Sequence, residues 1–215
     1  RYYSARLLEL GVEVLLGVAA RPEDMVAGAY NHVIVATGVN PRRLNSVAVD
    51  DPRVLTYAQA IETPGKVGAS VAILGAGGIG FDVAQLLSHP AGACDPSAPD
   101  IEGFSLDWGV DVSFAERGGL RPPLNLRPSA RQITLYQRKP GSGFGAGLSR
   151  TRGWANVQEV LRRGVAMVGD VEYGHLAPEG LHVTIGGVPQ LIAVDTFVLC
   201  VGQEPQIGIV ASLAL

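Results

Sequence analysis

The pattern of hydrophobic and polar positions predicts strands that alternate with amphipathic helices. Continuous apolar stretches predict strands at residues 12–16, 31–38, 71–74, 132–137, 164–168 and 196–201. Apolar residues at helical spacing predict helices at residues 1–10, 79–88 and 151–163, with a short helix around residues 56–61. Alternation of strands and helices is typical of an α/β fold with a parallel sheet.

Two segments depart from this alternation. Three short stretches within residues 171–194, separated by turn residues, predict a small antiparallel meander: "VEYGHL", "GLHVTIGG" and "PQLIAV". Residues 89–130 are rich in proline and glycine, and they separate a predicted helix from the next strand by about forty residues. A crossover connection normally returns to its sheet sooner, so this segment is predicted to be an insertion.

A glycine-rich turn lies between the strand at 71–74 and the helix at 79–88. Gly75, Gly77 and Gly80 fill the pattern G-x-G-x-x-G. The first glycine permits a tight turn, the second lets the backbone approach a pyrophosphate, and the third lets the helix pack on the strand. The start of the helix offers N–H groups to the same phosphates. The turn therefore predicts a dinucleotide site, with a purely structural glycine turn as the alternative.

The residues after the strand at 132–137 indicate which nucleotide binds. An acidic residue there favours NAD, whereas a nearby arginine favours the 2′-phosphate of NADP. Arg138 and Lys139 stand there, and Arg150 and Arg152 follow a glycine-rich loop and are expected to close on the same phosphate. NADPH is therefore the predicted nucleotide. Alternatively, Arg138 and Lys139 are solvated surface charges, and the two later arginines belong to the start of a helix.

Asp82 is expected in the first turn of the helix that follows the glycines. A carboxylate there is favoured by the helix dipole, and this alone would explain it. The alternative is that Asp82 lies near the nicotinamide and orients its carboxamide.

Composition excludes several kinds of partner. The net charge is −3 with 17% charged residues, and no basic patch indicates nucleic acid. No apolar run approaches the roughly 20 residues that span a bilayer, and no signal peptide is evident, so no membrane partner and a cytoplasmic location are expected. The chain does not begin with Met and ends on "IGIVASLAL", so a fragment of a longer polypeptide is expected.

The reactive side chains form no catalytic or metal-binding pattern. Cys94 and Cys200 have neither CxxC nor metal spacing and are predicted to be free thiols in a reducing compartment. The four histidines have no metal spacing either, and they are expected to be structural. No Ser/His/Asp set or G-x-S-x-G turn is present, so no catalytic residue and no metal ligand are predicted.

Five segments carry a family resemblance. They read, in order, "HVIVATGVNPR", "DDPRVLTYAQAI", "VAILGAGGIGFDVAQLLSHP", "ITLYQRKPGSGFGAGL" and "VDTFVLCVGQEP". The strand ending in Ala-Thr-Gly and the glycine turn fit the wider group of flavoproteins with two dinucleotide-binding domains. The string GAGGIGFD, the long insertion and the segment from QRK to TRGW at residues 151–154 are specific to a narrower group. Together they closely resemble the C-terminal FAD- and NADPH-binding part of bacterial NADPH-dependent 2,4-dienoyl-CoA reductases, over essentially the whole chain.

The resemblance implies an NADPH-binding domain inserted into an FAD-binding domain. Residues 1–65 would be a partial FAD-binding domain, residues 66–202 the Rossmann-like NAD(P)H-binding domain, and residues 203–215 the return into the FAD-binding domain. Because the glycine turn of the FAD domain is absent from this chain, the FAD site is expected to be incomplete and FAD binding to be poor. Exposed apolar surface on residues 1–65 favours a dimer.

The resemblance also implies roles for individual residues. The residues that would cradle the pyrophosphate are Gly75, Ala76, Gly77, Gly78, Ile79 and Gly80. Arg138 and Lys139 would meet the 2′-phosphate, and a side chain at Gly78 would obstruct stacking of the nicotinamide on the flavin. Thr37 and Gly38 would lie near FAD, and Gly202 and Gln203 near the nicotinamide or the hinge between the domains.

In the family, hydride passes from NADPH to FAD, and electrons then pass through an iron–sulfur cluster to FMN, which reduces the dienoyl-CoA of fatty-acid β-oxidation. FMN and the 4Fe–4S cluster are expected only in the full-length enzyme, so this chain would carry only the first step. Its expected partners are NADPH and the rest of its own polypeptide, namely the FMN barrel and the other half of the FAD domain. The alternative is an ADP- or nucleotide-binding module without hydride chemistry, from a related iron–sulfur flavin dehydrogenase.

Overall fold

The computed structural model describes residues 1–215 except 48–49, 90–99, 122–128 and 214–215. The chain divides into two compact units, of which the smaller combines residues 1–40 with 205–215 and the larger spans residues 41–204. The larger unit holds all of the predicted glycine turn and its flanking elements.

A five-stranded parallel sheet forms the centre of the larger unit, in the strand order β2-β9-β3-β4-β5. Its strands are β2 (Val54–Thr56), β3 (Ser70–Leu74), β4 (Gln132–Tyr136), β5 (Ala166–Val168) and β9 (Thr196–Leu199). The helices of this unit are α3 (Tyr57–Glu62), α4 (Gly78–Ser88), α5 (Ile101–Trp108) and α6 (Gly153–Arg162). The parallel sheet, its strands and the helices flanking them confirm the predicted α/β fold.

The sheet is covered on both faces, which explains why its strands are apolar throughout. Successive side chains of a strand point to opposite faces. In β3, Val71 and Ile73 join the core that contains α3, α4 and α6, whereas Ala72 and Leu74 join a second core on the other face. Both cores are therefore built around the strand that leads into the glycine turn.

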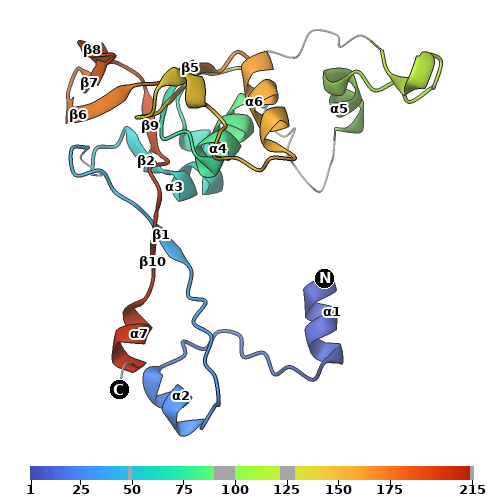
Figure 1. Ribbon diagram of the computed structural model, residues 1–215, viewed down its shortest axis with the longest axis vertical. Coiled ribbons are helices and arrows are strands. Elements are labelled where there is room, and N and C mark those ends of the chain that lie inside the picture. Colours follow the sequence, from blue (N-terminus) through green and yellow to red (C-terminus); the bar gives the residue numbers. More distant parts are fainter. Residues whose placement is uncertain (48–49, 90–99, 122–128, 214–215) are drawn as a thin grey trace. The chain divides into compact units, whose positions relative to one another are not determined.

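The second core is closed by the predicted meander, which the structure confirms as an antiparallel sheet. Its strands are β6 (Val171–Ala177), β7 (Gly180–Ile185) and β8 (Val188–Ile192). Leu181 and Val183 of β7 are buried in the same cluster as Leu74. Figure 1 shows β6, β7 and β8 at one side of the larger unit and α4 and α6 at the other. The unit is thus three layers deep, with the parallel sheet in the middle.

The short helix predicted around residues 56–61 is α3, and its start is fixed by a capping box. The Thr56 side chain accepts from the backbone N–H of Gln59, and the Gln59 side chain accepts from the backbone N–H of Thr56 at 2.8 Å. Since β2 pairs with β9, residues 41–65 belong to the larger unit. The assignment of the segments to FAD and to NADPH stays a prediction.

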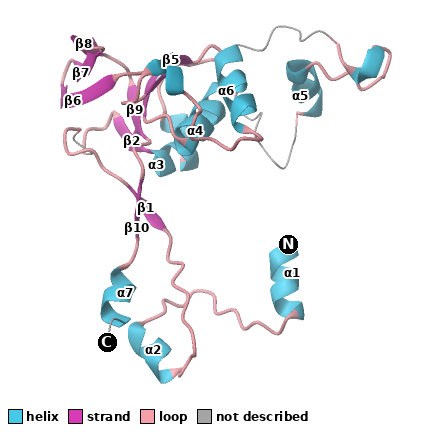
Figure 2. Ribbon diagram, in the orientation of Figure 1, coloured by secondary structure: helices cyan, strands magenta, loops and turns pink. Residues whose placement is uncertain are grey.

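The smaller unit contains α1 (Tyr2–Glu9), α2 (Pro22–Ala27) and α7 (Gly208–Leu213), and α1 confirms the predicted first helix. The strands predicted at residues 12–16 and 31–38 are wrong, since both stretches are loop; Figure 2 colours the chain between α1 and α2 as loop. A strand needs a neighbouring strand for its N–H and C=O groups, and neither stretch forms a strand pair with any described residue. Ile34 is accordingly 90% exposed.

Two short strands lie where the chain passes between the units. β1 (Val39–Pro41) pairs with β10 (Gln203–Pro205). Next to this pair, the N–H of Arg42 donates to the carbonyl of Gly202 at 3.0 Å. In the part of the chain that the structure describes, no helix is long and apolar enough to cross a bilayer.

We expect Gly80→Ala to lower the free energy of unfolding by about 2 kcal/mol, because a Cβ at this position would lie 1.9 Å from the carbonyl oxygen of Gly75. The partner is backbone and cannot rotate away, so the strain outweighs the roughly 1 kcal/mol by which alanine favours a helix over glycine. Urea unfolding followed by circular dichroism measures the change. Gly77→Ala is the matched control, since a Cβ there meets nothing within 4 Å; equal midpoints for the two variants would contradict the expectation.

Candidate functional site

The carboxyl ends of β3, β4 and β9 meet at one edge of the sheet and form a cleft of about 330 Å³. From β3 the chain continues to β4 on one side, whereas the strand on the other side of β3 is β9, which comes much later in the sequence. The order of strands therefore reverses at β3, and open α/β sheets bind ligands at such a switch point. The cleft is lined by residues that follow these strands, by two loop glycines and by one tyrosine: Gly75, Ala76, Gly77, Gln137, Arg138, Lys139, Gly143, Gly147, Tyr173, Cys200, Val201 and Gly202.

The turn after β3 borders the cleft and requires glycine at two positions. Gly75 has φ +112°, and a Cβ on it would lie 2.3 Å from the carbonyl oxygen of Cys200. Gly80 lies against the carbonyl of Gly75, as described above. Gly77 is the N-cap of α4 and provides no capping side chain, so the N–H groups of the first helical turn are available to a ligand.

The remaining residues of the turn have distinct positions. Ala76 lines the cleft, whereas Ile79 packs against the core on the helix side of the sheet. Next to Gly78 the space is open, since a Cβ added there would have Leu148 Cδ2 as its nearest neighbour, at 4.0 Å. A side chain at residue 78 would therefore extend into open space beside the cleft.

Two cations stand at the cleft without carboxylate partners. Arg138 and Lys139 are exposed and line it directly after β4. Within the described residues, neither side chain forms an ion pair or a hydrogen bond, and no Asp or Glu lines the cleft. An unpaired guanidinium and an unpaired ammonium leave their donors available to an anionic ligand.

Tyr173 reaches the cleft from β6, and the sequence analysis did not identify it. Its hydroxyl donates to the carbonyl of Tyr136 at 3.1 Å, and the same carbonyl accepts from the N–H of Gly75 at 2.8 Å. Burial raises the pKa of Tyr173. No motif marks this residue, because only the packing of the meander on the parallel sheet brings it to the glycine turn.

Cys200 lies at the end of β9 and is 7% exposed. It is a free cysteine, as predicted, and burial raises the pKa of its thiol to about 12. Cys94 lies outside the described residues. The Cys200 thiol therefore stays protonated near neutral pH and is a poor nucleophile.

Three other residues expected at the site lie elsewhere. Asp82 and Arg152 line a second cavity, of about 400 Å³, bordered by α4, α5 and α6. Asp82 is also not in the first turn of α4, which begins at Gly78, and Arg152 is the N-cap residue of α6. Arg150 is exposed and lines neither cavity. Neither Arg150 nor Arg152 is thus among the residues that line the cleft with Arg138.

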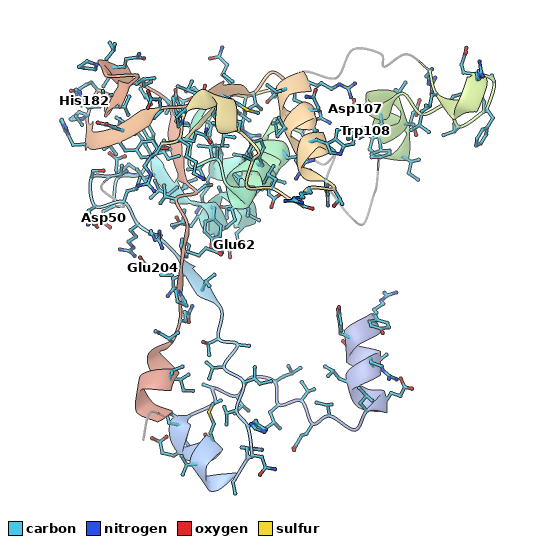
Figure 3. All side chains as sticks on the ribbon, viewed as in Figure 1. Asp50, Glu62, Asp107, Trp108, His182 and Glu204 are labelled. Atoms are coloured by element: carbon cyan, nitrogen blue, oxygen red, sulfur yellow. The ribbon has the colours of Figure 1, made fainter. Side chains whose placement is uncertain are left out.

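The second cavity contains a buried ionic cluster. Arg163 is 3% exposed and its Nη2 donates to Asp107 at 2.8 Å and lies 3.0 Å from His89 Nε2. Burial disfavours the charged form of Glu159, but hydrogen bonding and the charges of His89 and Arg163 outweigh it and hold the pKa of Glu159 below its usual range. Figure 3 labels Asp107 beside α5 and α6. The cluster connects these two helices to the end of α4. His89 therefore contacts Arg163 and Glu159 within the fold, which agrees with a structural role.

The residues expected near FAD or at the hinge bond within their own unit. In the larger unit, Gly202 lines the cleft, and Gln203 Nε2 donates to the Tyr57 hydroxyl at 2.9 Å. In the smaller unit, the Thr37 hydroxyl donates to the carbonyl of Gln206, whose N–H donates to the carbonyl of Gly38 at 3.0 Å. Thr37 and Gly38 are not among the residues that line the cleft. Among the described residues, no group of three or more His, Cys, Asp or Glu side chains could hold a metal.

Comparison with known proteins gives a family match over most of the chain. The family model described as pyridine nucleotide-disulphide oxidoreductase matches residues 18–215. The metal reductase of Desulforamulus reducens is 25% identical over 202 residues, which cover 92% of this chain and 28% of that protein. The cinnamate reductase of Clostridium sporogenes is 33% identical over 89 residues, which cover 41% of this chain and 13% of that protein.

Solved structures share the fold. A 2-naphthoyl-CoA reductase complex superposes with a TM-score of 0.68 at 15% identity, covering 99% of this chain and 26% of that one. Thioredoxin reductase of T. acidophilum gives a TM-score of 0.51 at 15% identity, covering 80% of this chain and 44% of that one. The chain thus spans a minor part of the length of each of these proteins.

We expect the Cys200 thiol to react with iodoacetamide at pH 8 at least about 100-fold more slowly than free cysteine, because its raised pKa leaves little thiolate. The reaction is followed by mass spectrometry of the Cys200 peptide in a Cys94→Ser variant, where Cys200 is the sole thiol. The same variant unfolded in urea should react at the normal rate. Fast alkylation of the folded protein would show that the thiol is activated.

Proposed function

Because the chain belongs to the pyridine nucleotide-disulphide oxidoreductase family, we propose that it is the NADPH-binding part of a flavin-dependent reductase. The observation that carries this proposal is the composition of the cleft. A glycine turn with an uncapped helix N-terminus lies beside Arg138 and Lys139, and no carboxylate is among the described residues that line the cleft.

Each part of the cleft suits a part of the nucleotide. The pyrophosphate would lie against the backbone of Gly75 to Gly77 and the first turn of α4, where N–H groups and the helix dipole favour negative charge. Sites that prefer NAD place an acidic residue on the ribose 2′-hydroxyl. Here Arg138 and Lys139 line the cleft after β4, where such an acidic residue would be expected, and both would favour a 2′-phosphate over a hydroxyl.

The opposite end of the nucleotide would lie toward Gly202. Gly78 leaves open space beside the cleft, and Cys200 and Val201 provide a wall with no charged group. When bound, NADPH supplies a hydride. The residues of this chain would bind and orient the nucleotide, and the raised pKa of the Cys200 thiol keeps it protonated near neutral pH.

For the substrate of the longer protein we propose a 2,4-dienoyl-CoA thioester. Two of the similar proteins are named for cinnamate and for 2-naphthoyl-CoA. In both compounds a carboxyl or thioester carbonyl is conjugated with carbon–carbon double bonds. The FMN and 4Fe–4S centres of such a reductase would be held by other parts of the polypeptide. We propose that FAD binds this chain weakly, since Thr37 and Gly38 lie in a unit whose described residues include none that is buried.

We expect Arg138→Ala to raise the Kd for NADPH at least about 10-fold and to leave the Kd for NADH within about twofold, because only NADPH carries the 2′-phosphate. Isothermal titration of the purified chain with NADPH, NADH and ADP provides the measurement. Arg152→Ala is the matched control, since Arg152 lines the second cavity, and its Kd for NADPH should not change.

Two results would decide against the proposal. If ADP binds the wild-type chain as tightly as NADPH does, the chain is a nucleotide-binding module without a hydride donor. If Arg152→Ala weakens NADPH as much as Arg138→Ala does, the cleft at Arg138 is not the site of the 2′-phosphate.

A further inference from the structure

The second cavity, bordered by α4, α5 and α6, shares no lining residue with the nucleotide cleft in the part of the chain that the structure describes. Its volume of about 400 Å³ is in the range of pockets that hold small molecules. One wall consists of Asp100, Phe104, Asp107 and Trp108, which recur at helical spacing and so lie on one face of α5 and its N-cap. This helix belongs to the insertion at residues 89–130, whose described residues contribute nothing to the lining of the nucleotide cleft.

Local signals fix α5 at both ends. The Asp100 Oδ1 atom accepts from the N–H of Gly103 at 2.7 Å and caps the start of the helix. Gly109 ends the helix with φ +64°, the left-handed conformation that favours glycine. Between these ends, Phe104 and Trp108 stand about one turn apart, with ring centroids separated by 6.1 Å. The insertion thus places a pair of aromatic rings at the cavity, where Figure 3 labels Trp108.

The two rings are exposed although they line a cavity. Phe104 is 58% exposed and Trp108 is 37% exposed. Aromatic surface that stays in contact with water forgoes the free energy that its burial provides. The face of an aromatic ring also stacks favourably against another planar ring. A planar ligand in the cavity would therefore cover apolar surface that the described residues leave uncovered.

The buried side of the cavity has unused hydrogen-bond donors on Arg163. The Nη2 atom of this residue is engaged by Asp107 and His89, as described above. Its Nε and Nη1 atoms are buried and have no hydrogen-bond acceptor among the described residues, although Nε lies 3.8 Å from Glu159 Oε1. Buried donors in proteins are nearly always paired. A ligand that places an acceptor against Arg163 would therefore be favoured.

The charges of the lining restrict the kind of acceptor. Carboxylates outnumber guanidinium groups among the described lining residues, with Asp82, Asp100, Asp107 and Glu159 against Arg152 and Arg163. A phosphate or a carboxylate ligand would meet this excess of negative charge. An ammonium ion would be attracted to it but has no acceptor for the donors of Arg163. The combination favours an uncharged ligand that has an acceptor for Arg163 and N–H donors for the carboxylates.

We propose that the second cavity binds an uncharged purine base or nucleoside. A ring nitrogen or carbonyl of the purine accepts from Arg163, and its N–H groups donate to Glu159. The ring plane lies against Phe104 and Trp108. Guanine has both kinds of group, since O6 and N7 accept and the N2 amino group donates. Because the carboxylate of Asp82 is exposed at the cavity, the phosphates of a nucleotide would be disfavoured.

Trp108 gives a direct readout, because the chain has two tryptophans and the other, Trp154, does not line the cavity. In the Trp154→Phe variant, guanosine should change the fluorescence of Trp108 saturably, with excitation at the long-wavelength edge where guanosine does not absorb. GMP, benzoate, benzylamine and indole should each have a Kd at least about 10-fold higher, since the first two are anions, benzylamine is a cation and indole has no ring acceptor. In the reverse variant, Trp108→Phe, the remaining Trp154 should show no saturable change.

Phe104→Ala tests the aromatic wall without removing any of the buried charges. Combined with Trp154→Phe, it should raise the Kd for guanosine at least about 10-fold, because stacking on the ring is lost. Phe114→Ala in the same background is the matched control, since Phe114 is exposed in the same insertion and does not line the cavity. It should leave the Kd unchanged.

Each contrary result would overturn the proposal. The absence of a saturable response to guanosine would mean that the cavity binds no purine, and tighter binding of benzylamine would make it a cation site. Equal affinity for GMP and guanosine would show that the carboxylates do not select against phosphate. An equal loss of affinity in Phe104→Ala and Phe114→Ala would place the binding elsewhere. None of these outcomes involves the nucleotide cleft, so NADPH binding stands or falls separately.

Discussion

The candidate site depends on the close approach of backbone segments at the carboxyl edge of the parallel sheet. A side chain at Gly75 would collide with the carbonyl of Cys200 from β9, and one at Gly80 would collide with the carbonyl of Gly75. These contacts bring β3, β9 and the start of α4 closer together than any other residue would permit. The same turn ends at the uncapped N-terminus of α4, so the close backbone contacts and the N–H groups available at the cleft belong to one segment.

The elements that the sequence predicted correctly have local signals. The apolar run before Gly75, the glycine spacing and the helical stripe after it define β3, the turn and α4 within some twenty residues. The meander is marked by its turn residues. Residues 12–16 are as apolar as β3, and residues 31–38 contain an apolar run at 33–36. A strand also requires a hydrogen-bonding neighbour, which a single sequence does not reveal. Thus Ile34 is exposed whereas Ile73 is fully buried.

The residues of the candidate site also divide into those that the sequence predicts from local signals and those that depend on the packing of distant segments. Gly75, Gly77, Arg138 and Gly202 come together because each lies within three residues of the end of a strand in one parallel sheet, and that relation can be inferred from the order of strands. Asp82 lies on α4, where successive side chains turn to different faces, and Arg152 is the N-cap residue of α6; both line the other cavity. Tyr173 reaches the cleft through the packing of the distant meander, for which the chain carries no motif.

The pairing of β1 with β10 has a consequence for how this architecture can change over evolutionary time. The two ends of the larger unit are neighbours, joined next to this pair by the hydrogen bond between Arg42 and Gly202. A unit whose ends meet can be gained, lost or exchanged within a surface loop of a host domain, because the host then closes only a short gap and the entropy of loop closure changes little. The larger unit therefore has the geometry of a unit that can be transferred whole, because the cleft and all the strands that form it would move together.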